Sequence, residues 1–275
     1  MEVIFVKNIQ PLNKLQKICG IDWSQNNMKL AIASGDKNIY LFEEEGNYKE
    51  SFSTNSSKSA NYEIKQILFN PSSDKLAVSQ SDDIVYIYYM GLNWGEPKNI
   101  INKYEIIGNN CMIWSNTNPK EIIFGSSNGK ILIGLLDENN TIKELYNHKF
   151  SCISLSSSLD GNYIISGHKD SSIIIYNRQT SEIKKLIEHS TIPSCLTWGI
   201  DSKILAAGND SKIVIYDING ENVQAFDCSN EAKEFIYCKA ISSGDAIVLG
   251  NKNLFHVFVY NELKHEWEKI IAKLD

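Results

Sequence analysis

Residues 163–176 read YIISGHKDSSIIIY, and this segment contains a pattern that recurs along the whole chain. An apolar strand ends in small residues, the chain turns at Asp170, and a second apolar strand ends in the aromatic Tyr176. The pattern occurs six times, and its opening strands begin 41 to 46 residues apart, at Leu30, Leu76, Ile122, Tyr163, Ile204 and Ala246. A period of about 40 to 45 residues with several short strands per unit is typical of a β-propeller, whose four-stranded blades pack face to face.

Each repeat is predicted to contribute four strands. In the first repeat we expect them at residues 19–24, 29–34, 38–42 and 48–53. These strands are nearly continuous runs of Ile, Leu, Val and Tyr, as expected when neighbouring blades cover both faces of each sheet. We therefore predict an all-β fold, with residues 1–275 forming a single β-propeller domain of six four-stranded repeats.

The sequence predicts one strand more than six four-stranded repeats require. Residues 2–9 have the pattern of a strand in front of the first repeat, while residues 266–271 already complete the sixth. In many propellers an early strand completes the last blade, so the extra strand predicts a seventh blade that is incomplete or missing. Two interpretations stay open: the chain is part of a longer protein, which we prefer, or six blades close with a displaced terminus.

The composition is that of an ordinary globular protein, 43% hydrophobic, with a net charge of −6 from 27 basic and 33 acidic residues. The charges are interspersed and form no basic stripe, so nucleic acid is not expected as a partner. No apolar run approaches the roughly 18 residues that span a bilayer, and residues 1–10 lack the features of a secretory signal. We therefore expect a cytosolic protein, with membrane contact unlikely in this region.

Four of the six cysteines share a register in the first strands of their repeats: Cys111, Cys152, Cys195 and Cys238. In the cytosol we expect them to be reduced and to act as small apolar residues. Neither the cysteines nor the five histidines have the spacing of metal ligands. The sequence therefore predicts no metal site and no cofactor.

One segment resembles a catalytic motif. Residues 125–129 read GSSNG, which matches the nucleophile elbow of hydrolases. That elbow projects its serine from a strand-to-helix turn, whereas these residues fall between two strands of the third repeat. A propeller enzyme would also need acidic or histidine clusters on the first strands, where this sequence has Cys, Ile, Met and Thr. We therefore predict no catalytic residue and no enzymatic activity.

The fourth repeat contains polar residues in an order that suggests a structural network. His148 precedes the first strand, Ser166 lies late in the second, Asp170 is at the turn and Tyr176 ends the third. This order resembles the WD40 repeat, in which such residues link the strands through buried hydrogen bonds. Tyr replaces the usual Trp, and the fifth repeat keeps His189, Asp210 and Tyr216 but lacks the Ser. The resemblance implies degenerate WD40 repeats, held together more by apolar packing.

Several less generic strings narrow the resemblance further. In order along the chain they include residues 23–27, 81–86, 94–95, 166–168, 206–208, 226–227 and 267–268. Their order and spacing are similar to those in the amino-terminal propeller of the intraflagellar transport protein 172 family. That resemblance implies a non-catalytic scaffold of the intraflagellar transport B complex, which binds the other subunits of that complex. It also implies a location in the cilium, basal body and cytoplasm.

An alternative function stays open at this stage. Degenerate WD40 propellers also occur as adaptors in vesicle-coat and ubiquitin-ligase assemblies. For a binding surface, the sequence offers the hairpin at residues 90–95, in which Leu92 and Trp94 are candidate partner contacts. Trp94 has a second interpretation, in which it folds back over its own blade. The Ser- and Asn-rich residues 54–60 are expected to form a mobile surface loop.

Overall fold

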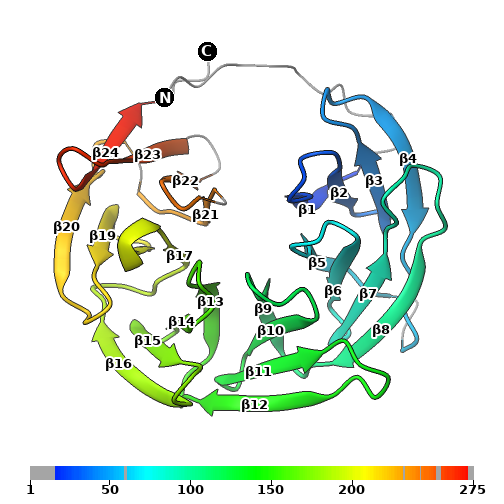
Figure 1. Ribbon diagram of the computed structural model, residues 1–275, viewed down its shortest axis with the longest axis horizontal. Coiled ribbons are helices and arrows are strands. Elements are labelled where there is room, and N and C mark those ends of the chain that lie inside the picture. Colours follow the sequence, from blue (N-terminus) through cyan, green and yellow to red (C-terminus); the bar gives the residue numbers. More distant parts are fainter. Residues whose placement is uncertain (1–15, 59–60, 232, 242, 252–254, 272–275) are drawn as a thin grey trace. The chain divides into compact units, whose positions relative to one another are not determined.

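A computed structural model describes residues 16–58, 61–231, 233–241, 243–251 and 255–271. Its strands form six four-stranded antiparallel sheets, and within each sheet the strands lie in the order of the sequence (Figure 1). This architecture confirms the predicted WD40-like β-propeller fold with six four-stranded repeats. We number the sheets blade one to blade six along the chain. The predicted extra strand at residues 2–9 lies outside the described residues.

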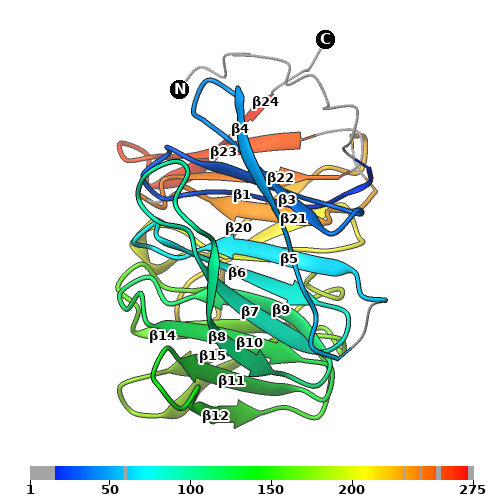
Figure 2. The same cartoon turned by 90° about the vertical axis from the view of Figure 1, so that its right-hand side faces the viewer.

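The strand bounds follow the predicted repeat closely. Blades one to three consist of β1 (Ile18–Trp23), β2 (Leu30–Ser34), β3 (Asn38–Phe42), β4 (Tyr48–Ser53), β5 (Ile64–Phe69), β6 (Lys75–Gln80), β7 (Ile84–Tyr89), β8 (Asn99–Glu105), β9 (Asn109–Trp114), β10 (Glu121–Ser126), β11 (Lys130–Leu135) and β12 (Ile142–Asn147). The four strands of blade one start and end within one residue of the expected bounds. In the turned view of Figure 2, β5, β6 and β7 of blade two lie side by side.

The remaining blades repeat this arrangement. Blades four to six consist of β13 (Cys152–Ser157), β14 (Tyr163–His168), β15 (Ser172–Asn177), β16 (Glu182–Glu188), β17 (Cys195–Trp198), β18 (Ile204–Ala207), β19 (Lys212–Tyr216), β20 (Asn222–Asp227), β21 (Tyr237–Ala240), β22 (Ala246–Gly250), β23 (Phe255–Asn261) and β24 (Glu266–Ile271). In the described part of the chain, helical structure is confined to one 3-10 turn, η1 (Ile200–Ser202).

By its internal contacts the chain divides into two compact units. The amino-terminal unit contains blades one and two and residues up to Phe124, together with residues 132–144 of blade three. The carboxy-terminal unit contains residues 125–131 and everything from Leu145 onward, including blades four to six. We describe each unit by itself, and the expectation of one domain over residues 1–275 stays a prediction.

Packing on both faces explains why the strands lack a clean polar alternation. In blade five, Ala206 belongs to a buried cluster shared with Ile165 and Ile173 of blade four. Its strand neighbours Leu205 and Ala207 belong instead to a cluster shared with blade six. Successive side chains point to opposite faces of a strand, so a strand covered on both faces must be apolar throughout.

In four of the six repeats, the recurring Asp or Asn stabilises the turn between the second and third strands. The side chains of Asp36, Asn128, Asp170 and Asp210 each accept a hydrogen bond from the backbone N–H two residues later. The residue in between has a positive φ, as at Lys37 (67°) and Ser171 (71°). Short acceptor side chains that bond to their own backbone favour such turns, so the chemistry of the turn explains the recurring residue type.

Candidate functional site

The first polar group in blade four joins His148 to Asp170. His148 follows β12, and its Nε2 lies 2.9 Å from Oδ2 of Asp170 in the β14–β15 turn. Ser172, which begins β15, donates from Oγ to Oδ1 of Asp170 at 2.7 Å. Burial alone would raise the pKa of Asp170, but the hydrogen bonds from His148 and Ser172 outweigh it and hold that pKa below its usual value.

Ser166 belongs to a second polar group in the same blade. Its Oγ accepts a hydrogen bond from the hydroxyl of Tyr146 at 2.8 Å and lies 2.7 Å from Nε2 of His168. Nδ1 of His168 lies 2.9 Å from the carbonyl oxygen of Phe150. A carbonyl can only accept, so Nδ1 carries the proton and Nε2 accepts from Ser166. Burial lowers the pKa of His168, which is consistent with this neutral ring.

Of the four residues selected from the sequence, the structure brings His148 and Asp170 together and places Ser166 with other partners. Tyr176 stacks on Tyr146, with ring centroids 4.8 Å apart. Sequence reasoning missed His168 and Tyr146, which take the positions beside Ser166. The sequence did contain a signal for His168. It lies two positions after Ser166 in the same strand, and side chains two positions apart lie on the same face of a strand.

Blade five arranges its polar residues differently. Nδ1 of His189 lies 2.8 Å from the hydroxyl of Tyr216, while Asp210 accepts a hydrogen bond from Ser190 at 2.6 Å. Burial lowers the pKa of His189, and Asp210 opposes this shift only from a distance. Ala206 and Ala207 stand where the WD40 pattern has Ser, and in this blade His189 contacts Tyr216 of β19 directly.

In the amino-terminal unit, the hairpin at residues 90–95 of blade two is fastened to blade one by Lys29. The Lys29 side chain is only 2% exposed, and its ammonium donates to the carbonyl oxygens of Gly91 at 2.8 Å and of Met90 and Asn93 at 3.4 Å. Burial lowers the pKa of Lys29, and nearby Lys98 lowers it further, while Glu50 and Glu96 oppose the shift. Three carbonyl oxygens meet the three donors of an ammonium group.

Trp94 and Leu92, the two candidate partner contacts, lie in this hairpin in different environments. The ring of Trp94 lies 5.3 Å from the Lys29 ammonium and packs against the buried cluster of blades one and two. Leu92 is 60% exposed. A lysine ammonium over an aromatic face is stabilising, so Trp94 contributes to the fastening of the hairpin.

A second contact holds the same hairpin. The backbone N–H of Gly95 donates to Glu50 of β4 at 3.2 Å, and the ammonium of Lys98 lies 2.8 Å from the other carboxylate oxygen. Lys98 is nearly buried, so solvent screens this ion pair less than an exposed one. Leu92 is therefore presented on a hairpin that is fixed on both sides.

The loop after blade one, which we expected to be mobile, makes defined contacts over residues 54–58. Thr54 and Tyr62 share a hydroxyl contact at 2.9 Å, and the hydroxyl of Tyr86 accepts from the backbone N–H of Ser57 at 2.8 Å. Lys103 donates to Oγ of Ser57 at 2.6 Å. This segment is thus joined to blade two through several side chains.

The six cysteines are free, and those of the shared register lie at or near the starts of β9, β13, β17 and β21. Within the described residues, no group of three or more His, Cys, Asp or Glu side chains could hold a metal ion. Nor does any helix there have the length and apolar character needed to cross a bilayer.

Comparison with protein families locates two WD40 repeats, described as "WD domain, G-beta repeat", at residues 139–177 and 180–217. Each matched segment covers the fourth strand of one blade and the first three strands of the next. These are the segments that contain His148 and Asp170 in one case, and His189 and Asp210 in the other.

Comparison with curated proteins finds relatives along nearly the whole chain. Intraflagellar transport protein 172 of Chlamydomonas reinhardtii is 37% identical over 98% of this chain, which covers 16% of that protein. The homologues of Homo sapiens and Drosophila melanogaster are each 33% identical, over 96% and 94% of the chain, which covers 16% and 15% of their lengths. The chain thus spans about one sixth of the length of these relatives.

Proposed function

Because this chain is homologous to the intraflagellar transport 172 proteins over nearly all of its residues, we propose that it is a non-catalytic, protein-binding propeller of the intraflagellar transport B complex. The proposed partners are other subunits of that complex, and the proposed location is the cilium or flagellum, the basal body and the cytoplasm. The similarity over 94% to 98% of the chain is the observation that carries this proposal.

The polar residues of blade four form hydrogen bonds with one another, which supports a binding role over a catalytic one. His148, Asp170 and Ser166, which a hydrolase would need free for substrate, form hydrogen bonds that join strands of the blade. We infer that these residues, with the aromatic Tyr176, serve as a structural network. Repeat folds of this kind present extended surfaces of loops and hairpins, which are suited to docking other proteins.

Affinity purification of the full-length protein from ciliated cells tests the transport function. We expect the other subunits of the transport complex to co-purify, and the tagged protein to be visible in cilia and basal bodies. Recovery of a vesicle coat or a ubiquitin ligase in their place would favour the alternative adaptor function. Recovery of the protein alone would contradict both functions.

For the binding surface, we propose that Leu92 contacts the partner and that Trp94 contributes indirectly, by holding the hairpin that presents Leu92. An apolar side chain on a hairpin fixed by Lys29 and Glu50 loses little further freedom on binding, which favours affinity. The hydrogen bonds from Lys29 and to Glu50 hold this hairpin in place, which distinguishes Leu92 from apolar residues on ordinary loops.

Leu92→Asp in the full-length protein should reduce recovery of at least one transport subunit by about tenfold, as expected for an anchor of about 1.4 kcal/mol or more. Ile107→Asp is the matched control, because Ile107 is 71% exposed in the same blade but beyond the other end of β8. Normal recovery with Leu92→Asp, or equal losses with both variants, would contradict the assignment of this surface.

A further inference from the structure

Two free cysteines, Cys195 and Cys238, meet at the interface between blades five and six, within the carboxy-terminal unit. Cys195 opens β17, and Cys238 lies in β21, the first strand of the next blade. These two strands contact each other directly. Cys195 belongs to the buried cluster that the two blades share, and Cys238 packs against the same cluster. Each thiol is therefore directed at the neighbouring blade.

Hydrogen bonds on both sides of the pair hold the two first strands in place. Ser194, directly before Cys195, donates from its hydroxyl to the carbonyl oxygen of Phe235 at 2.8 Å. Beyond the end of β17, the backbone N–H of Ile200 donates to the carbonyl oxygen of Gly244 at 2.9 Å. A disulfide needs Cα atoms within about 7 Å of each other and Cβ atoms that point together. Two neighbouring strands fixed at both ends favour that geometry.

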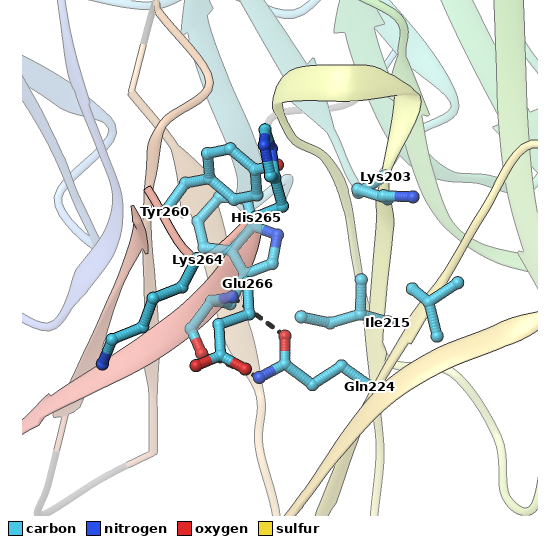
Figure 3. Close-up of a pocket in the computed structure, with 9 residues that line it drawn as sticks. Lys203, Ile215, Gln224, Tyr260, Lys264, His265 and Glu266 are labelled. Atoms are coloured by element: carbon cyan, nitrogen blue, oxygen red, sulfur yellow. Dashed lines mark hydrogen bonds between the residues drawn. The ribbon is translucent and has the colours of Figure 1, made fainter. Parts of the chain in front are cut away.

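The outer strands of the same two blades are joined as well. Gln224 of β20 accepts from and donates to the Trp267 backbone in β24, and Figure 3 shows its side chain beside a cleft of about 240 Å³. Neither cysteine lines that cleft. The two blades are thus fixed to each other at their first and last strands, and the thiols lie in a packed part of the interface.

A shared register alone does not direct a cysteine at the next blade. Cys152 of blade four has the same register, 43 residues before Cys195, but a β-bulge lies between Cys152 and Ser154. The Cys152 thiol donates to the carbonyl oxygen of Ser154 at 3.5 Å, within its own strand. The first strands of blades five and six pair regularly with their neighbours, without such a bulge. Cys195 and Cys238 therefore remain directed across the interface.

The two thiols differ in their access to solvent. Cys195 is 1% exposed, whereas Cys238 is half-buried. The hydrogen bond with the Cys238 thiol, and burial, raise the pKa of Cys195. Oxidation of a cysteine depends on its thiolate and on access for the oxidant. An oxidant therefore reaches Cys238 first, and Cys195 is placed to react with the oxidised sulfur second.

We propose that Cys195 and Cys238 form a reversible disulfide between blades five and six when the protein meets hydrogen peroxide. The Cys238 sulfur attacks one peroxide oxygen, and the O–O bond breaks to leave a sulfenic acid and one water. The Cys195 sulfur then attacks the Cys238 sulfur, so that the S–S bond forms, the S–O bond breaks and a second water leaves. Two thiols are oxidised and one peroxide is reduced. This modification does not depend on the transport function.

Peptide mapping of the whole chain tests the proposal. The protein is reduced, freed of reductant, treated with hydrogen peroxide, and alkylated before digestion and mass spectrometry. We expect the main linked peptides to contain Cys195 and Cys238, the intact mass to fall by two hydrogen atoms, and dithiothreitol to restore it. In urea, the main partner of Cys238 should change to Cys228, ten residues away, because short loops close more readily.

Three variants separate the two steps. Cys238→Ser should abolish the link, and Cys195→Ser should leave Cys238 as a sulfenic acid, which dimedone labels. Cys111→Ser is the matched control, because Cys111 is a half-buried cysteine of the same register, and it should form the link as the unchanged protein does. Absence of a disulfide, a different main pair in the folded protein, the same pair in urea, or a link that survives Cys238→Ser would overturn the proposal.

Discussion

The interface between blades one and two and that between blades five and six are closed by different chemistry. Between blades one and two, the carboxylate of Asp22 accepts from the backbone N–H of Phe69 at 2.7 Å, and Lys29 donates to three carbonyl oxygens. Between blades five and six, Gln224 bonds twice to the Trp267 backbone, Ser194 donates to the Phe235 carbonyl at 2.8 Å, and the Asp201 carboxylate accepts from the hydroxyl of Tyr260 at 2.8 Å. The first two of these links are neutral, and none of the three uses a buried ammonium.

Three of these links nevertheless share one geometric rule, whereas the bonds of Lys29 join residues 61 to 64 positions apart. The bonded residues lie 47 positions apart for Asp22 and Phe69, 43 for Gln224 and Trp267, and 41 for Ser194 and Phe235. Each separation is close to one repeat, because stacked blades place equivalent strands beside each other. The repeat therefore determines which positions meet, and the individual residue determines whether a charge or a neutral group is used there.

The largest effect in this comparison is expected for Lys29→Met. The substitution removes an ammonium from three carbonyl oxygens and from the Trp94 ring, leaving buried acceptors unsatisfied. We expect it to lower the free energy of unfolding by about 3 kcal/mol, measured by urea denaturation. Lys212→Met, at an exposed position, should change it by less than about 0.5 kcal/mol. Equal stability of the two variants would show that the charged interface adds no net stability.

A neutral hydrogen-bonded link between blades should contribute less to the free energy of unfolding than Lys29 does. Gln224→Ala leaves one N–H and one C=O of Trp267 without their partner, and we expect a loss of about 1.5 kcal/mol. Gln66→Ala should cost a similar amount, because Gln66 makes the same pair of bonds to the Met112 backbone at 3.2 and 3.0 Å. Asn222→Ala, exposed on the same strand as Gln224, is the control. A loss at Gln224 as large as that at Lys29 would remove the distinction between the interfaces.

Much of the fold could be predicted because it depends on spacing. The period of the apolar runs located the strands of blade one to within one residue, and the recurring Asp or Asn located the turns at residues such as Asp36 and Asp170. Both signals are local: a strand needs apolar side chains on both faces, and a turn needs a short acceptor. Neither requires knowledge of which blades touch.

The candidate site was less predictable because its partners are set by side-chain direction. The order of His148, Ser166, Asp170 and Tyr176 did not reveal that Ser166 would bond to His168 and Tyr146. Lys29 gave no signal either, since a single lysine at the start of a predicted strand is most often a surface residue. Only the packing of the hairpin at residues 90–95 over blade one shows that this lysine is buried.

The smallest expected effect is a difference between the two units in how far acid lowers their stability, because all five histidines lie in the carboxy-terminal unit. Burial lowers the pKa of His168, His189 and His256 below the value of about 6.5 that holds in an unfolded chain. As the pH falls below 6.5, the unfolded chain binds protons first, so the stability that these neutral rings contribute is lost. Hydrogen bonds hold the pKa of carboxylates such as Asp36 and Asp170 below their ordinary value, so the stability that they contribute is lost at a lower pH than that of the histidines.

Hydrogen exchange read by mass spectrometry at pH 7.5 and pH 5, corrected for intrinsic rates, measures this difference peptide by peptide. We expect protection to fall at pH 5 in blades four to six and to stay nearly constant in blades one and two. His168→Gln should reduce the pH dependence of blade four, whereas substitution of the exposed His265 by Gln should leave it unchanged. Equal loss of protection in both units would mean that they unfold as one, because a histidine in one unit would then destabilise every blade.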